Sequence, residues 1–333
     1  MTRFGIIIPA LAFLLAPLGP AYAVERADAT DTLEAEVPAS ADETEGEKTD
    51  GSNGEALPEG DAAYGAFQRG LYLTAYQLAL PRAKLGDPAA QTLVAEIYSR
   101  GLGVPQNMKE AAFWYENAAE GGDTAAQLKY ALLLLEGRHV EGDRDRAREL
   151  MRKAADAGNS SAQFNYGQML ITDQPGGEGV EKALPYMTLA ADSGIADAQF
   201  ALAQIYAYGT GIEADPETAR TWMIRAARSG FDTAQLDLAV WLIDGIGGDV
   251  DYEAGFGWMR RAANLGNVMA QNRLSHLYIN AIGTRPDPIE AAKWYILSRR
   301  AGLNDPRLED FFQGLTADEQ KAGIEAANNF RSR

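Results

Sequence analysis

The sequence contains no cysteine and only two histidines. The absence of cysteine excludes a disulfide framework and any thiolate-ligated metal. Neither His139 nor His276 belongs to a metal-binding pattern such as His-x-x-x-His, so each is interpreted as a solvated or packing side chain. The chain also lacks a Gly-x-Ser-x-Gly elbow, a Walker loop and a dinucleotide-binding fingerprint. These absences predict a protein that is not an enzyme, with no catalytic residue, no metal and no cofactor.

Positive charge is scarce relative to negative charge. The formal net charge is −17 and the isoelectric point is about 4.6. A chain this acidic repels the phosphate backbone of nucleic acids and the head groups of anionic lipids. We therefore expect no nucleic-acid partner and no electrostatic attraction to membranes.

The sequence has few extended hydrophobic stretches. The main one lies at the N-terminus, where prolines interrupt it. Arg3 precedes an apolar stretch over residues 4–15, and Ala21-Tyr22-Ala23 has the small-x-small pattern of a cleavage site. The pattern predicts a signal peptide over residues 1–23 that is cleaved after Ala23. The alternative is a membrane anchor, but the run falls short of the roughly 20 residues that span a bilayer. The sequence thus predicts an exported protein without a membrane-inserted segment.

Residues 24–60 differ in composition from everything that follows. They contain twelve acidic and two basic residues, a net charge of −10, and almost no aromatic or branched apolar side chains. Such a segment buries too little surface to offset the entropy of ordering it, which predicts a disordered linker. A sharper interpretation is a protease-sensitive or electrostatic regulatory tail.

A spacing of 36 residues repeats through most of the chain, and several residue types share it. A fixed period of this size indicates stacked supersecondary units. Ala-Gln pairs place their glutamines at Gln91, Gln127, Gln163, Gln199, Gln235 and Gln271. A bulky residue recurs at Trp114, Leu150, Tyr186, Trp222, Trp258 and Trp294. Small residues recur at Ala95, Ala131, Gly167, Ala203, Ala239 and Ser275.

The sequence pattern within each unit predicts two helices. In the first full unit, Asp87 and Pro88 predict a helix that starts at about residue 89 and ends at residue 100. A second helix is predicted over residues 107–119, and Gly121-Gly122 is expected to end it with a left-handed cap. The small residues let the two helices of a unit approach closely. The buried glutamines are expected to hydrogen-bond a backbone group at each junction.

The ends of the array have to be capped, because one unit cannot bury its own apolar face. Residues 61–85 are interpreted as a truncated first unit, so the repeats extend over residues 61–302. Residues 303–333 are predicted to form a helical cap, in which Thr316 and Glu319 make a capping box. The loop over residues 172–179 lacks the Gly-x-Gly spacing of its equivalents, which predicts a local irregularity in the third full unit.

The repeats resemble the Sel1-like repeat family, which is related to tetratricopeptide repeats. The segment AAQTLVAEIYSRGLGVPQNMKEAAFWYENAAEGGD, residues 89–123, carries almost every consensus position. The resemblance covers a partial unit and six full ones. It implies an all-α, right-handed α-solenoid that acts as a protein-binding scaffold.

A narrower resemblance concerns the periplasmic negative regulators of exopolysaccharide production in α-proteobacteria, the ExoR type. It rests on the predicted signal peptide, the acidic lead, YLTAYQLAL, KLGDPAAQTLVAEIYSRGLGVPQN and the ending AAKWYILSRRAGLNDP. It implies a periplasmic protein that binds and restrains the sensor domain of a membrane histidine kinase. A separate hypothesis adds a periplasmic protease as a second partner, because cutting the acidic lead or a loop would remove the inhibitor and release the kinase. The alternative from another class is a structural adaptor in envelope or polysaccharide-export assembly.

The resemblance to tetratricopeptide repeats also implies where a partner binds. It places the first helix of each unit on the concave side, and helical spacing then selects the side chains that face a partner. The alternative is that these side chains pack against neighbouring helices. The predicted protein-binding residues are Glu96, Leu128, Leu132, Phe164, Gln168, Phe200, Gln204, Tyr208, Leu236, Asn272 and His276.

Overall fold

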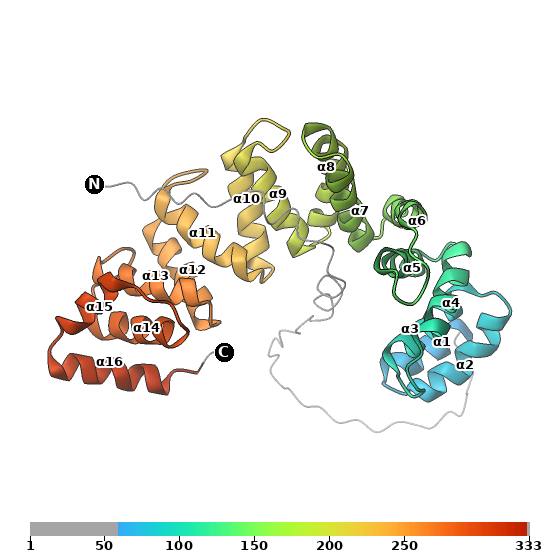
Figure 1. The fold of residues 1–333 in the computed structure, drawn as a ribbon, viewed down its shortest axis with the longest axis horizontal. Coiled ribbons are helices and arrows are strands. Elements are labelled where there is room, and N and C mark those ends of the chain that lie inside the picture. Colours follow the sequence, from blue (N-terminus) through green and yellow to red (C-terminus); the bar gives the residue numbers. More distant parts are fainter. Residues whose placement is uncertain (1–58, 332–333) are drawn as a thin grey trace, which may run out of the picture. The chain divides into compact units, whose positions relative to one another are not determined.

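A computed structural model describes residues 59–331 of the chain. These residues form sixteen helices and no strand (Figure 1). The predicted signal peptide and most of the predicted linker lie outside them. The helices are α1 (Glu59–Gln68), α2 (Tyr72–Lys84), α3 (Pro88–Arg100), α4 (Met108–Glu120), α5 (Thr124–Glu136), α6 (Arg144–Asp156), α7 (Ser160–Asp173), α8 (Gly177–Asp192), α9 (Ala196–Tyr208), α10 (Pro216–Arg228), α11 (Asp232–Asp244), α12 (Tyr252–Asn264), α13 (Val268–Ile279), α14 (Pro288–Arg300), α15 (Pro306–Gln313) and α16 (Ala317–Asn329).

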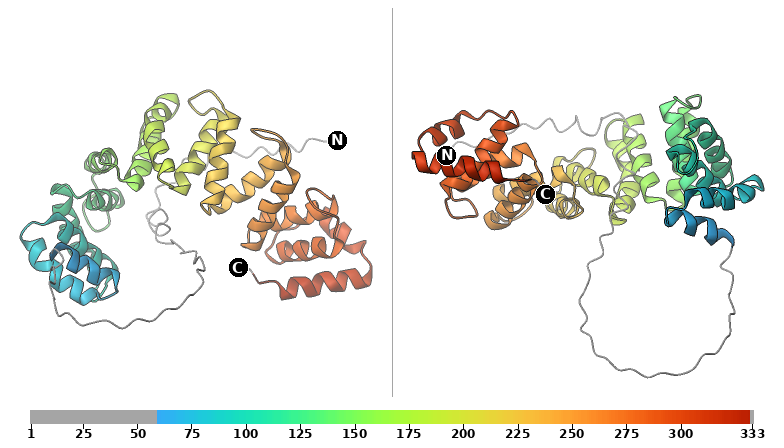
Figure 2. Two further views of the ribbon diagram at one scale, coloured as in Figure 1. Left: turned by 180° about the vertical axis from the view of Figure 1, so that it is seen from behind. Right: turned by 90° about the horizontal axis from the view of Figure 1, so that it is seen from below.

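The chain divides into two compact units between residues 162 and 163, at the start of α7. We call the described parts the N-terminal unit (residues 59–162) and the C-terminal unit (residues 163–331). Within each unit, consecutive helices pack against one another as a series of helical hairpins (Figures 1 and 2). The prediction of an all-α fold built from two-helix repeats is confirmed. We call the first helix of a repeat helix A (α3, α5, α7, α9, α11, α13) and the second helix B (α4, α6, α8, α10, α12, α14).

Side-chain caps set the helix boundaries that the sequence predicts. The carboxylate of Asp87 accepts a hydrogen bond from the backbone N–H of Ala90 at 3.2 Å, and Pro88 occupies the first turn of α3. Asn107 caps α4 in the same way. The left-handed glycine after α4 is Gly122 (φ +88°), whereas Gly121 keeps a right-handed conformation (φ −70°).

The glutamine of each repeat ties helix A to the end of the preceding helix B. Its side-chain amide donates to a backbone carbonyl eight residues earlier, in the last turn of that helix B. Such carbonyls have no partner within their own helix, and a buried amide needs an acceptor. Five junctions show this bond at 2.9 to 3.3 Å, which confirms the prediction for them: Gln91 to Ala83, Gln127 to Ala119, Gln199 to Ala191, Gln235 to Ala227 and Gln271 to Ala263.

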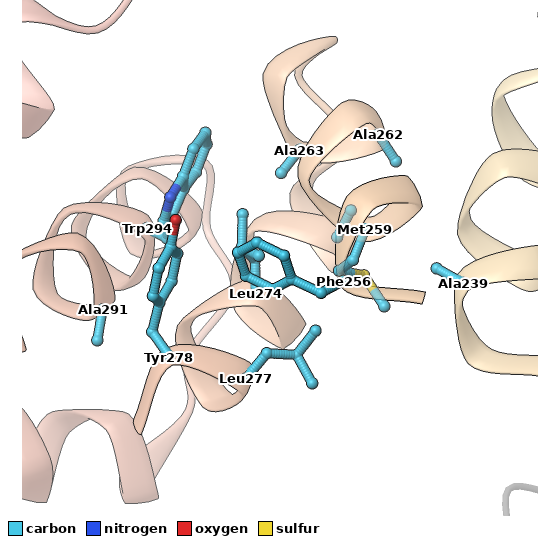
Figure 3. Close-up of a cluster of buried hydrophobic side chains, with 11 residues drawn as sticks. Ala239, Phe256, Met259, Ala262, Ala263, Leu274, Leu277, Tyr278, Ala291 and Trp294 are labelled. Carbon is cyan, nitrogen blue, oxygen red and sulfur yellow. The ribbon is translucent and has the colours of Figure 1, made fainter. Parts of the chain in front are cut away.

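Apolar side chains from consecutive repeats form the core. In the C-terminal unit, one cluster draws on four consecutive helices, α11 to α14 (Figure 3). Phe256 of α12 and Tyr278 of α13 meet edge to face with ring centroids 5.2 Å apart, and Trp294 of α14 is almost completely buried. Ser275, in the series of small residues, donates to the carbonyl of Ala291 at 2.7 Å, so α13 and α14 are in close contact.

The loop between helices A and B lies against the preceding helix B. Gly283 has a φ of +68°, and a Cβ atom there would overlap the carbonyl of Tyr252 in the first turn of α12. Gly247, 36 residues earlier, meets the carbonyl of Pro216 in the first turn of α10 in the same way. Only glycine combines a left-handed backbone with so close an approach. These two loops therefore contribute a second contact between neighbouring repeats.

Helices outside the six full repeats pack against both ends of the described chain. In the N-terminal unit, Tyr76 of α2 and Tyr98 of α3 pack edge to face and join their hydroxyl groups at 2.7 Å. In the C-terminal unit, α16 packs against α14, and the ring of Phe330 lies 5.1 Å from that of Trp294. Thr316 and Glu319 form the predicted capping box of α16. The irregular third repeat is also present, because α7 and α8 are separated by residues 174–176 alone.

Replacing Gly283 with alanine should destabilise the protein by about 2 kcal/mol or more, since the left-handed conformation and the overlap with Tyr252 both add cost. Urea unfolding followed by circular dichroism measures this. Gly257→Ala is the matched control, because Gly257 is helical with nothing within 4 Å of an added Cβ, and it should stabilise α12 by roughly 0.5–1 kcal/mol. Equal effects of the two variants would contradict the loop contact.

A second prediction concerns the carbonyl oxygens of the glutamine series. Gln199 Oε1 accepts a hydrogen bond from Ser229 at 2.9 Å, whereas Gln235 Oε1 is buried without a partner among the described residues. Leu265 lies 36 residues after Ser229 with a similar backbone conformation (φ −77°, ψ 0° against φ −73°, ψ 3°). Leu265→Ser should therefore stabilise the chain by about 1 kcal/mol, and Ser229→Ala should destabilise it by a similar amount. The urea midpoints measure both, and a loss of stability in Leu265→Ser would contradict the proposed bond.

Candidate protein-binding face

Each helix A leaves one face accessible. On α9, the accessible residues Ala201, Gln204 and Tyr208 are spaced three and four apart, whereas Leu202 and Ile205 are buried on the other side. Residues at this spacing share one face of a helix. Most of the predicted protein-binding residues fall on the equivalent faces of the other A helices. We call the accessible sides of α9, α11 and α13 in the C-terminal unit the helix-A face.

Four predicted residues lie on the helix-A face with part of their surface exposed. Phe200, Gln204 and Leu236 are half-buried, and Tyr208 is 47% exposed. The ring of Phe200 lies 4.8 Å from that of Phe231, the residue that precedes α11. Phe200 thus contributes to the packing between α9 and α11, and Tyr208 is the large side chain that remains most available to a partner.

Two predicted apolar residues are buried, which corrects the expectation that their side chains face a partner. Phe164 is 6% exposed and packs in a core cluster with Val180 and Leu202, and Leu128 of the N-terminal unit is 5% exposed. For both residues, packing against neighbouring helices accounts for the apolar side chain. Gln168 of α7 is half-buried.

The two other predicted residues of the N-terminal unit lie on its own A helices. Leu132 of α5 is half-buried. Glu96 of α3 accepts a hydrogen bond from the hydroxyl of Tyr115 in α4 at 2.6 Å and pairs with Arg100 at 3.4 Å. Burial and the adjacent carboxylate of Glu96 raise the pKa of the Tyr115 hydroxyl. Glu96 therefore already serves a contact within its own repeat.

Asn272 and His276 meet a carboxylate of the C-terminal cap. His276 Nε2 lies 2.8 Å from Oδ2 of Asp305, and Asn272 Nδ2 donates to the same oxygen at 3.2 Å. The other oxygen of Asp305 caps α15. Burial alone would raise the pKa of Asp305, but the hydrogen bonds from His276 and Asn272 hold it below its ordinary value. Asn272 is buried, so it and His276 anchor the cap.

Sequence reasoning missed two charged residues of the helix-A face, Asp237 and Arg273. Asp237 directly follows the predicted residue Leu236, and Arg273 directly follows the predicted residue Asn272. The two charged residues are therefore 36 positions apart, and the repeat spacing could have been used to find both. Asp237 is half-buried, and burial raises its pKa to about 6 against the opposing effect of Arg273. Burial and the charge of Asp237 together raise the pKa of Tyr208. The helix-A face therefore carries Tyr208, the partly desolvated carboxylate of Asp237 and Arg273, whose charges interact.

Within residues 59–331, no cluster of three or more histidine, aspartate or glutamate side chains is arranged to hold a metal ion. His139 is exposed in the loop between α5 and α6. None of the helices in this part of the chain combines the length and apolarity that crossing a bilayer requires.

A series of equivalent helical hairpins with an accessible helix-A face defines an all-helical repeat scaffold. The family model of the Sel1 repeat matches six consecutive segments, residues 88–123, 124–159, 160–195, 196–231, 233–267 and 268–303. The chain belongs to the Sel1 repeat family. Proteins of this family are scaffolds and are generally not enzymes. No curated protein matches the sequence.

Solved structures show the same fold. A Sel1 repeat protein from Oxalobacter formigenes is 26% identical, with a TM-score of 0.61, and the match covers 74% of this chain and 99% of that one. The protective antigen c5321 of uropathogenic Escherichia coli strains is 25% identical, with a TM-score of 0.52, and the match covers 82% of this chain and 68% of that one. Both likenesses support the solenoid of Sel1 repeats.

The pKa of Asp237 predicts how stability changes with pH. Because the folded state raises this pKa from 3.8 to about 6, the protonated carboxyl favours folding, and that contribution is lost as the pH rises through 6. Asp237→Asn should therefore stabilise the chain by on the order of 2 kcal/mol at pH 7.5 and by almost nothing at pH 4. Urea unfolding at several pH values measures the difference. Asp244→Asn, which removes an exposed acid from the same helix, is the control. A gain independent of pH would contradict the burial of Asp237.

Proposed function

We propose that this chain is an exported, periplasmic scaffold that negatively regulates exopolysaccharide production by binding and restraining the sensor domain of a two-component histidine kinase. Membership of the Sel1 repeat family supports a protein partner. The regulatory role is supported by the sequence resemblance to the ExoR type, and export is supported by the signal-peptide pattern that ends at Ala23.

The helix-A face carries the binding part of the proposal. Tyr208 exposes 47% of its surface at the end of α9, on a rigid element. Tyrosine and arginine are frequent anchors of interfaces, since they supply a large contact area and directed hydrogen bonds. The charge of Asp237 acts on Tyr208, and Arg273 acts on Asp237. A partner that places a cationic side chain beside Asp237 and a carboxylate beside Arg273 would neutralise both charges.

Burial of Asp237 makes the helix-A face favour a partner that carries a positive charge. A carboxylate with reduced hydration gains more from a new ion pair than a fully solvated one does. Once a cationic side chain covers Asp237, its pKa should fall again and the ionised form should be retained. We therefore expect a partner surface with a lysine or arginine beside an apolar patch that packs on Tyr208 and Leu236.

The proposal predicts that Tyr208→Ala weakens partner binding roughly thirtyfold, the effect of losing about 2 kcal/mol at an interface anchor. Crosslinked pull-down from periplasmic and inner-membrane fractions, read by mass spectrometry, identifies the partner, and titration with the purified sensor domain measures the affinity. Tyr252→Ala is the matched control, because Tyr252 is 52% exposed in the same unit but lies at the start of helix B α12.

The outcomes separate the two functional classes. Capture of one sensor kinase, weakened by Tyr208→Ala and not by Tyr252→Ala, supports the regulator and its binding face. Capture of export or cell-wall machinery instead would make the chain a structural adaptor. Deletion of the gene gives an independent answer, since loss of an inhibitor should raise polysaccharide output and loss of an assembly adaptor should lower it.

A further inference from the structure

The last repeat of the C-terminal unit has a hollow of about 510 Å³ between the start of α13, the end of α14 and the residues that follow α16. Its volume falls within the range of about 300–1,000 Å³ that is typical of sites for small ligands. Leu297 and Phe330 supply apolar surface to it, and Gln271, Arg300 and Arg331 supply polar groups. The hollow therefore combines apolar surface with a few polar groups, which is the usual composition of a binding site.

A comparison with an earlier junction of the same unit explains why this space is open. Arg225 of α10 pairs with Asp192 at 2.8 Å and donates to the carbonyl of Ala191 at the end of α8. The residue two repeats after Arg225 is Leu297, which has no charged end to reach the equivalent carbonyl. The shorter leucine leaves unfilled the space that a guanidinium group occupies in the earlier junction.

A second difference between the two junctions leaves a hydrogen-bond acceptor without a donor. Gln271 is 5% exposed, and its side-chain nitrogen donates to the carbonyl of Ala263, but its side-chain oxygen accepts no hydrogen bond from the described residues. In the earlier junction, the equivalent oxygen of Gln199 accepts from the hydroxyl of Ser229 at 2.9 Å. Ala301 takes the place of Ser229 with a similar backbone conformation (φ −81°, ψ 4° against φ −73°, ψ 3°), and it has no hydroxyl. A ligand in the hollow can supply the missing donor.

The charged residues that line the hollow are both arginines. Arg300 donates to the neutral side-chain amide of Asn328 at 2.7 Å, and this contact leaves its positive charge in place. Among the described residues, no aspartate or glutamate lines the hollow and none pairs with Arg331. Arginine binds carboxylates strongly, because its planar group can donate two parallel hydrogen bonds to one carboxylate. The hollow therefore favours a carboxylate, although the whole chain has a net charge of −17.

We propose that this hollow binds the carboxyl-terminal residue of a peptide or protein partner. The terminal carboxylate pairs with Arg300 and Arg331, the last backbone N–H donates to the oxygen of Gln271, and an apolar last side chain packs on Leu297 and Phe330. A fatty acid offers the carboxylate and the apolar chain but no N–H donor. A free amino acid offers its donor as an ammonium group, which the two arginines repel. The proposal does not rest on the regulatory function proposed above.

Isothermal titration calorimetry of the purified chain tests this site with three probes, which are acetyl-Ser-Ala-Leu with a free carboxylate, the same peptide with a C-terminal amide, and octanoate. The free-acid peptide should bind saturably, and amidation should weaken its binding roughly tenfold, since each exposed ion pair contributes at most about a factor of five. Changing Arg300 and Arg331 to glutamine should weaken the free acid by a similar factor and leave the amidated peptide unchanged. Arg285→Gln, which removes an exposed arginine from the loop before α14, is the control and should change neither.

Ala301→Ser separates loss of binding from loss of folding. Its hydroxyl should donate to Gln271 as that of Ser229 donates to Gln199, which raises the urea midpoint and occupies the acceptor. The variant should therefore be more stable than the native chain and yet bind the free-acid peptide roughly fivefold more weakly, with octanoate unaffected. Absence of saturable binding of the free-acid peptide, equal binding of the amidated peptide, tighter binding of octanoate, or an unchanged peptide affinity in Ala301→Ser would overturn the proposal.

Discussion

The hydrogen bond from a buried glutamine to the last turn of the preceding helix is the constraint on which the rest of the structure depends. It satisfies the side-chain amide, a buried donor that would otherwise lack a partner at a cost of about 1–3 kcal/mol. The bond joins residues of neighbouring repeats, such as Gln199 and Ala191, and therefore sets where one helix A begins relative to the helix B before it. The same geometry recurs at Gln91, Gln127, Gln235 and Gln271.

The glutamine bond between repeats also determines which side chains lie on the accessible face of the C-terminal unit. It holds α9, α11 and α13 so that residues of equivalent register form one accessible face, where Tyr208 and Asp237 influence each other. The hairpins stay the same while the side chains of this face differ from repeat to repeat.

The 36-residue period was sufficient to predict the repeats and the glutamine bonds, because these depend on local chemistry that the repeats share. The caps at Asp87 and Thr316 were predicted from the local residue patterns at the starts of their helices. The accessibility of single side chains was harder to predict. Phe164 and Phe200 occupy the same register, yet the first is buried and the second is half-buried, since their neighbours differ from repeat to repeat. The partner of His276 was missed because Asp305 lies in the cap, outside the repeat pattern.

Hydrogen exchange of the native chain, compared with a Gln199→Leu variant, tests the central role of the junction most directly. The substitution removes the bond to the Ala191 carbonyl and takes away the side-chain acceptor of the Ser229 hydroxyl. Because each repeat contacts only its neighbours, protection should fall in α8, α9 and α10 and stay nearly unchanged in α14 and α16. Unaltered protection around residue 199, or an equal loss throughout the C-terminal unit, would contradict the account.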